Sequence, residues 1–463
     1  MHRFLAKYGL AAHLALVAVA PLFLFPFCSA SAVAVVLLWL TLLAVVWCIL
    51  EPSVSRGERL HTARARVIAS AIRDPLFWLS LLLAAHAGFR ALNDGIRMAY
   101  DAEQSAWSLA AAAFPFYPGC TEGAGFLPFA VSVALVAVLV GTRHSLGRSA
   151  RLAFLLMAAT GAGLAAVVTL VAAHLGHLES LRLLSVSSAS ASFVGMAFGL
   201  HLLGGIAALA AAFERRWNRA MVLFPLAIGG TALGTFAFAP PALTALFGGA
   251  GLVMFGASFA YALRGLRQLT EFRLLVVFAL SLTTGGLLGA FLMPEAALSA
   301  RLGAFAERTF FADGFFALRR TLSDLALRAW QTSPWLGTGL GSFGLDIRFH
   351  ALASDWAVIP RGQVAIPNGG WLLLTERGIV GVALFALPLG FLVFSYGRRL
   401  ALWARAICLP HPATLLAPLA LVVLGLDAAF DASFLRADVL LVACAELAVS
   451  AKSFPPHESH LNV

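Results

Sequence analysis

Arginine and glycine residues gather in one stretch of the chain, where together they could hold a phosphate group. Arg319 and Arg320 are adjacent and Arg328 follows them. Each guanidinium carries a permanent charge on a fork of donors that matches phosphate oxygens. Three alternate glycines come next, namely Gly337, Gly339 and Gly341. The N–H groups of such glycines can surround an anion. The alternatives are an amphipathic helix whose arginines reach lipid head groups, followed by a tight turn.

A second group of polar residues follows the glycines and could supply an acid or a base. His350 and Arg361 precede Asn368 and Glu376. Asn368 and Glu376 would lie about 80° apart on a helix and could line one polar surface. A general base must reach the hydroxyl that it deprotonates, and His350 or Glu376 could take this role. The alternatives are solvated loop residues, a helix-capping Asn368 and a surface pair of Glu376 with Arg377.

Metal ligands do not cluster in the sequence. The five cysteines are scattered and contain no CxxC pair, which is the usual spacing of a metal or redox site. We therefore expect no metal and no other cofactor. Cys28 and Cys120 could form a disulfide bridge on an oxidising side of a membrane, or remain unpaired thiols.

Composition indicates which elements must position these residues. Of the 463 residues, 61% are hydrophobic and 12% are charged, and the mean hydropathy is +0.90. This balance excludes a soluble globular enzyme, a disordered chain and a small disulfide scaffold. A bilayer crossing takes about 20 apolar residues, so the apolar runs predict an all-α integral membrane protein with about twelve transmembrane helices. The expected spans lie near residues 8–27, 31–50, 75–91, 126–141, 152–173, 189–213, 220–239, 243–263, 274–293, 378–396, 413–426 and 439–450. The small pairs Gly229-Gly230 and Gly285-Gly286 within them indicate close helix contact.

The basic residues indicate the orientation in the membrane. The net charge is +10, and most arginines lie in short clusters between apolar runs. This pattern favours anchoring at the cytoplasmic face over binding of nucleic acid. With the N-terminus inside, the inside loops hold 20 of the 32 basic residues. We therefore expect both termini to be cytoplasmic, and we expect no nucleic-acid partner.

Two segments on the outer side exceed the length of a turn, residues 92–125 and 294–377. The second lies between the ninth and tenth expected spans and divides the chain into a nine-helix membrane region (1–293), a periplasmic loop (294–377) and a three-helix region with a short tail (378–463). Within the loop, an apolar stripe with helical spacing is formed by Leu322, Leu325, Ala326, Ala329 and Trp330. We expect this helix to lie along the membrane surface or against the bundle.

In their order and spacing, these motifs resemble the O-antigen ligase and O-antigen polymerase family of bacterial envelope proteins. The matching residues are Arg319, which lies fifteen residues before Pro334, the run from Pro334 to Phe343, and the segment from Asn368 to Gly381. The family pattern reads Pro-x-x-Gly-x-Gly-x-Gly-x-Phe, followed by a His-Asn pair, a leucine-rich turn, Glu-x-Gly and a closing Gly. The twelve-helix plan with a large outer loop is similar to the family over the whole chain. One departure is Pro367, which stands where the family has histidine; it favours a polymerase-like or exopolysaccharide member over a ligase.

The resemblance implies a glycosyltransferase in the bacterial inner membrane whose active site faces the periplasm. Its donor would be an undecaprenyl-diphosphate-linked glycan, its acceptor a glycan or lipid A–core, and its other partners the lipid bilayer and a chain-length regulator. Arg319, Arg320 and Arg361 would stabilise the departing diphosphate without a metal. Asn368 and Glu376 would position the acceptor or the loop, and His350 or Glu376 would act as base. The alternatives to a polymerase are an O-antigen ligase, which moves finished polymer onto lipid A–core, and a polysaccharide-related transporter.

Overall fold

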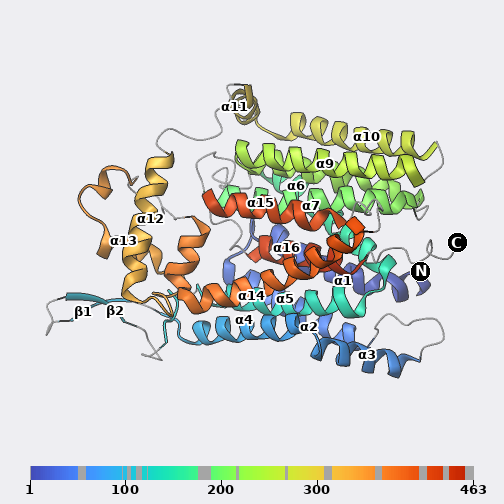
Figure 1. The fold of residues 1–463 in the computed structure, drawn as a ribbon. Coiled ribbons are helices and arrows are strands. Elements are labelled where there is room, and N and C mark those ends of the chain that lie inside the picture. Colours follow the sequence, from blue (N-terminus) through green and yellow to red (C-terminus); the bar gives the residue numbers. More distant parts are fainter. Residues whose placement is uncertain are drawn as a thin grey trace.

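The computed structural model describes most of the chain, in segments separated by gaps. The described residues are 2–50, 59–95, 97–101, 106–110, 117–121, 124–175, 189–214, 218–265, 269–306, 315–359, 368–405, 414–430 and 437–453. Apart from one small hairpin, the regular elements in these residues are helices (Figure 1).

Eight stretches of helix are long and apolar enough to cross a membrane. They lie in α2 (Ala30–Leu50), α4 (Pro75–Leu92), α5 (Phe126–Val140) with η1 (Gly141–Ser145), α6 (Arg148–His174), the run of η3 (Asn218–Leu223), η4 (Pro225–Gly230) and α8 (Thr231–Phe238), α9 (Pro241–Gly265), α10 (Leu269–Leu292) and α14 (Gly369–Arg405). Four shorter apolar helices lie in α1 (His2–Leu24), α7 (Ala189–Glu214), α15 (Leu416–Phe430) and α16 (Ala437–Ser453). Each expected span overlaps one of these, and the long apolar helices make this a membrane-embedded helical protein.

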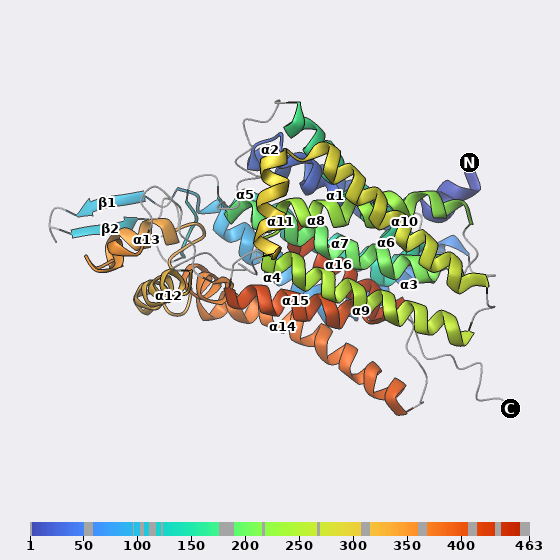
Figure 2. The ribbon, with the colours of Figure 1, turned by 90° about the horizontal axis from the view of Figure 1, so that it is seen from above.

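The remaining elements lie at the two ends of the long helices. A lobe projects from one end, and it contains α12 (Phe315–Thr332), α13 (Phe343–His350) and the antiparallel strands β1 (Arg97–Asp101) and β2 (Ala106–Ala110) (Figure 1, Figure 2). The start of α1 and the short helix α3 (Leu60–Ile72) lie at the opposite end (Figure 1). Helix α11 (Glu295–Ala306) and the turn η5 (Asp355–Ala357) complete the described elements. The all-α expectation missed the hairpin, which lies in the first of the two long segments.

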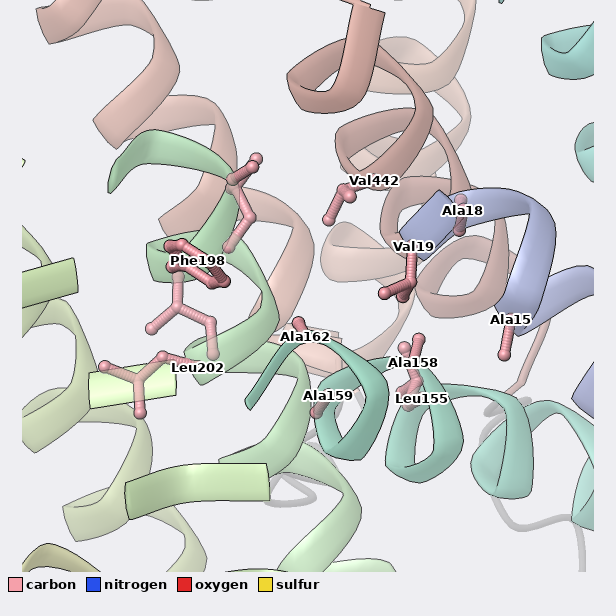
Figure 3. Close-up of a cluster of buried hydrophobic side chains, with 14 of the residues drawn as sticks. Ala15, Ala18, Val19, Leu155, Ala158, Ala159, Ala162, Phe198, Leu202 and Val442 are labelled. Carbon is pink, nitrogen blue, oxygen red and sulfur yellow. The ribbon is translucent and has the colours of Figure 1, made fainter. Parts of the chain in front are cut away.

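Small side chains set the packing at the centre of the helix bundle. Helix α6 presents Ala158, Ala159 and Ala162 to its neighbours, and all three are buried. Figure 3 shows this face of α6 beside α1, α7 and α16. Alanine lets helix backbones approach closely, so that van der Waals contact is extensive even where burial brings no gain over lipid.

Glycine extends this close approach where α10 meets the π-helical turn η4. A Cβ on Gly229 would lie 2.2 Å from the carbonyl oxygen of Ser281, and one on Gly285 would lie 2.5 Å from the carbonyl oxygen of Gly229. These glycines therefore confirm the expected helix contact, whereas a Cβ on Gly286 would meet nothing within 4 Å.

At the end opposite the lobe, one carboxylate joins two helix ends. Asp74 is the N-cap of α4 and accepts hydrogen bonds from Arg143 at 2.8 Å and from His144 at 2.9 Å, both in η1. Burial raises the pKa of Asp74, but the hydrogen bond from His144 and the charge of Arg143 outweigh this effect and hold the pKa well below its usual range. The ionised carboxylate therefore stabilises this end of the bundle.

The expected amphipathic helix is α12, and its stripe faces protein. Leu322, Leu325 and Ala326 are buried in an apolar cluster with Phe343 and Ile347 of α13. The start of α14 covers the same cluster with Trp371 and Leu372. The helix therefore packs within the lobe, against α13 and the start of α14.

Candidate functional site

The two motifs of the second long segment pair with each other through their backbones. The N–H of Thr338 donates to the carbonyl of Thr375 at 2.9 Å, and the N–H of Gly339 donates to the carbonyl of Glu376 at 3.1 Å. On the other side of the break in α14, the N–H of Ile379 donates to the carbonyl of Pro334 at 3.0 Å. The glycine-rich turn and the start of α14 therefore form one unit.

Glycine is required where these two segments touch. Gly378 has φ +65° and ψ −173° inside α14, and a Cβ there would lie 2.4 Å from the carbonyl oxygen of Trp335. Gly337 has φ +74°, and its Cβ would lie 2.5 Å from the carbonyl carbon of Glu376. Only glycine adopts this backbone and leaves this space without strain. The break at Gly378 also coincides with the expected start of the tenth span.

Arg90, in the last turn of α4, ties both motifs to the helix bundle. Its side chain is fully buried, at 0% exposure. One guanidinium nitrogen donates to the carbonyl of Glu376 at 2.7 Å, and another donates to the carbonyl of Leu336. The guanidinium also lies 5.8 Å from the ring centre of Tyr117. Because each carbonyl accepts from a charged donor, Arg90 positions the backbone of the site.

The first long segment contributes a short loop to the same site. The N–H of Thr121 donates to the carbonyl of Leu340 at 2.9 Å, and the N–H of Leu340 donates to the carbonyl of Gly119 at 3.1 Å. Residues 117–121 thus bind the glycine-rich turn along its far side. The described parts of the two long segments that are named here, expected separately, therefore meet in one lobe.

Cys120 in this loop is a buried free thiol. Its Sγ donates to Asp94 at 3.2 Å, and Cys28 is also free but exposed, so the expected alternative of a bridge between them is wrong. Burial and the neighbouring Asp94 raise the pKa of Cys120 to about 12. This thiol is therefore structural and unreactive.

Two carboxyl groups lie beside the glycine-rich turn. The carboxylate of Glu376 lies near the backbone N–H groups of Gly341 and Phe343, where α13 begins, and near Asp346. Asp346 is buried and accepts from the hydroxyl of Thr338 at 2.8 Å and from that of Ser342 at 3.1 Å. Burial raises the pKa of Asp346 against these two hydrogen bonds. Two carboxyl groups therefore lie side by side here.

Arg377 is buried rather than paired with Glu376 at the surface. Its side chain is 8% exposed, and its guanidinium lies 5.0 Å from the ring centre of Phe385. The expected alternative of a solvated Glu376–Arg377 pair is therefore wrong. Arg377 is thus an interior side chain, whereas Glu376 is half-buried.

Two of the three glycine N–H groups that could surround an anion already have internal acceptors. Gly337 donates to Ser333 at 2.9 Å, Gly339 donates to the carbonyl of Glu376, and Gly341 faces the Glu376 carboxylate. The anion next to this turn is thus a side chain of the protein itself.

Three of the arginines predicted from the sequence lie on α12. Arg319 is half-buried and Arg320 is exposed, both in the second turn of α12. Arg328 donates to the carbonyl of His350 at 2.7 Å and pairs with Asp355 at 3.1 Å. Its guanidinium therefore joins α12 to the end of α13.

Asn368 caps a helix, as one of the alternatives had it. Its Oδ1 accepts from the N–H of Trp371 at 3.0 Å, in the first turn of α14. Arg361 and Pro367 lie outside the described residues. The structure thus brings Glu376 and the three glycines together, and it joins Arg328 to His350.

Sequence reasoning missed the buried residues that hold the site, above all Arg90. A signal was present, because His86 and Arg90 lie four residues apart inside an expected span and an ionisable residue within a span marks a functional position. Nδ1 of His86 is hydrogen-bonded to the hydroxyl of Tyr117. The sequence does not indicate which segments would contact His86 and Arg90 in the fold.

A scan against models of protein families finds none that matches this chain, and a search of curated proteins finds no similar sequence. The resemblance to the ligase and polymerase family therefore rests on the motif residues, their order and their spacing.

Proposed function

We propose that this protein is a membrane glycosyltransferase that polymerises undecaprenyl-diphosphate-linked oligosaccharide units of O-antigen or exopolysaccharide at the periplasmic face of the bacterial inner membrane. The observation that carries the proposal is the pairing of the two family-like motifs around Glu376. Residues more than thirty positions apart along the chain meet in one hydrogen-bonded unit, as a composite active site requires.

In the proposed reaction, an acceptor hydroxyl attacks the anomeric carbon of the donor sugar. Glu376 takes the proton of the hydroxyl, the new glycosidic bond forms, and the bond from the anomeric carbon to the lipid diphosphate breaks. The electron pair leaves with the diphosphate, whose growing charge is stabilised by Arg319, Arg320 and Arg361. His350, beside Arg328, is the second candidate for the base.

The placement of the arginines supports this assignment. Arg320 is exposed on the lobe, and on the proposed periplasmic side a positive charge would run against the usual distribution. Arg328 is held by Asp355, so within this proposal it orders α12 and keeps the neighbouring arginines in place.

The test is glycan assembly in cells that carry Arg319→Ala or Arg320→Ala. Each change should lower the polymer level strongly, because one lost electrostatic donor typically costs roughly 10²–10³ in rate. Arg59→Ala is the matched control, since Arg59 is an exposed arginine at the opposite end of the bundle. Wild-type polymer in both α12 variants, inserted at normal levels, would contradict the proposal.

Gel analysis of lipopolysaccharide in a deletion strain separates a polymerase from a ligase. Loss of all but single repeats supports the polymerase. Loss of long bands together with retained lipid-linked polymer supports the O-antigen ligase instead.

One observation favours the transporter as a second candidate. His201 in α7 and Glu446 in α16 are both 2% exposed, inside apolar helices. Intramembrane polar residues of this kind are typical of transporters. Uptake or export of lipid-linked glycan by vesicles, without any change in chain length, would favour this function.

A further inference from the structure

Glu446 is buried in the helix bundle, far from the lobe along α16. Its side chain is 2% exposed, so it does not extend to the membrane surface. Its Oε1 lies 2.6 Å from the position that a Cβ on Gly204 of α7 would occupy. Its Oε2 has no hydrogen-bond partner among the described residues. The carboxyl group therefore fills the space that this glycine leaves between α7 and α16.

A second buried polar side chain, that of His201, lies on α7, one turn before Gly204. His201 precedes Gly204 by three residues, so both lie on one face of α7. The imidazole is 2% exposed, and its Nε2 also has no partner among the described residues. Leu155 of α6 lies 3.8 Å from the Cβ position on Gly204. Figure 3 shows Leu155, Leu202 and Val442, which come from the same three helices, among the apolar side chains of the bundle core.

The surroundings decide which protonation state these groups can hold. An ionised carboxylate without a partner is very costly in an apolar environment, whereas the neutral acid costs only its unmade hydrogen bonds. The titratable and charged groups whose side chains are described on elements that contact α16 are His201 (α7), Tyr8 and His13 (α1), Arg151 and His174 (α6), Arg143 and His144 (η1), Asp427 (α15), and Glu376, Arg377 and Tyr396 (α14). Several of these are engaged elsewhere: His13 with Leu40, Arg143 and His144 with Asp74, Arg151 with Leu146, and Tyr396 with Thr414. No cation among them is bonded to Glu446 in the described residues.

We propose that the junction of α6, α7 and α16 is an intramembrane proton-binding site, in which Glu446 holds one proton at neutral pH and His201 is the neighbouring proton acceptor. On release, the proton leaves the carboxyl oxygen for His201 or for water, and the carboxylate that remains requires α7 and α16 to separate. This site is independent of the glycosyltransferase chemistry, since it uses none of the lobe.

Infrared difference spectroscopy of the purified full-length protein tests the proposal. At pH 7 the spectrum of the wild type minus that of Glu446→Gln should contain the C=O band of a protonated carboxylic acid, and this band should shift in D₂O. Glu295→Gln is the matched control, because Glu295 is exposed at the start of α11 and should lose only carboxylate bands. If the Glu446 difference contains only carboxylate bands, the proposal is overturned.

Thermal unfolding provides a second measurement. A carboxyl group that keeps its proton in the fold and loses it on unfolding stabilises the fold less at each higher pH. The melting temperature of the wild type should therefore fall more between pH 5 and pH 9 than that of Glu446→Gln, which carries a neutral side chain of the same shape. Equal falls would also overturn the proposal. Should Glu446→Gln fail to insert, Glu446→Asp replaces it in the infrared experiment, where the acid band should shift rather than vanish.

Discussion

Replacing Arg90 by methionine should release the lobe from the helix bundle without unfolding the bundle. Methionine keeps most of the side-chain volume and removes the two hydrogen bonds to the carbonyls of Glu376 and Leu336. A hydrogen bond to a charged group contributes about 1.5–3 kcal/mol, so the gross loss is about 3–6 kcal/mol. Burial of the guanidinium itself is costly, which places the net loss near the lower end.

Amide hydrogen exchange measures this loss where it occurs. A loss of about 3 kcal/mol corresponds to roughly 100-fold faster exchange, since each 1.4 kcal/mol is a factor of ten. We expect this in peptides that cover residues 334–342 and 369–378, and little change in α6. Arg90→Lys should give an intermediate rate, because one ammonium group cannot reach both carbonyls. Exchange within about threefold of the wild type in both peptides would refute the reasoning.

Three further predictions follow from the geometry. Because the pKa of Asp74 is depressed in the fold, the ionised carboxylate stabilises the fold at every pH above its unfolded pKa of about 4. This stabilisation is lost as the pH falls further. Asp74→Asn should therefore melt at a lower temperature than the wild type at pH 7, and its melting temperature should fall less in acid. Gly378→Ala should abolish polymer formation because its Cβ would overlap the Trp335 carbonyl, whereas Gly344→Ala, with nothing within 4 Å, should retain it. A membrane-impermeant thiol reagent added to intact spheroplasts should label exposed Cys28 and spare buried Cys120; labelling of Cys28 only after lysis would contradict the expected orientation.

Hydropathy predicts the long helices of this chain because lipid demands about 20 apolar residues for each crossing. Local spacing predicts α12, since the stripe of Leu322, Leu325 and Ala326 has a helical period. Neither signal predicts the site, because it is built from contacts between distant segments. In the sequence, Arg90 is a single charged residue within an expected span. Only the structure shows that the carbonyls of Leu336 and Glu376 are its acceptors. In the sequence, the alternate glycines indicate an anion site. The structure places the Glu376 carboxylate beside them.

The position of Glu376 bears on how the proposed donor would bind. Its carboxylate lies near the N–H groups of Gly341 and Phe343, and a diphosphate cannot reach the same donors while that carboxylate stays there. Two anions at one set of N–H groups would repel each other, so donor binding there would free Glu376 to approach the acceptor hydroxyl. Glu376→Gln should therefore bind undecaprenyl diphosphate more tightly than the wild type, because the charge competitor is gone, and should still lose kcat, because the base is gone. Unchanged affinity together with lost kcat would mean that the arginines of α12 alone receive the diphosphate and that Glu376 never leaves the glycine-rich turn.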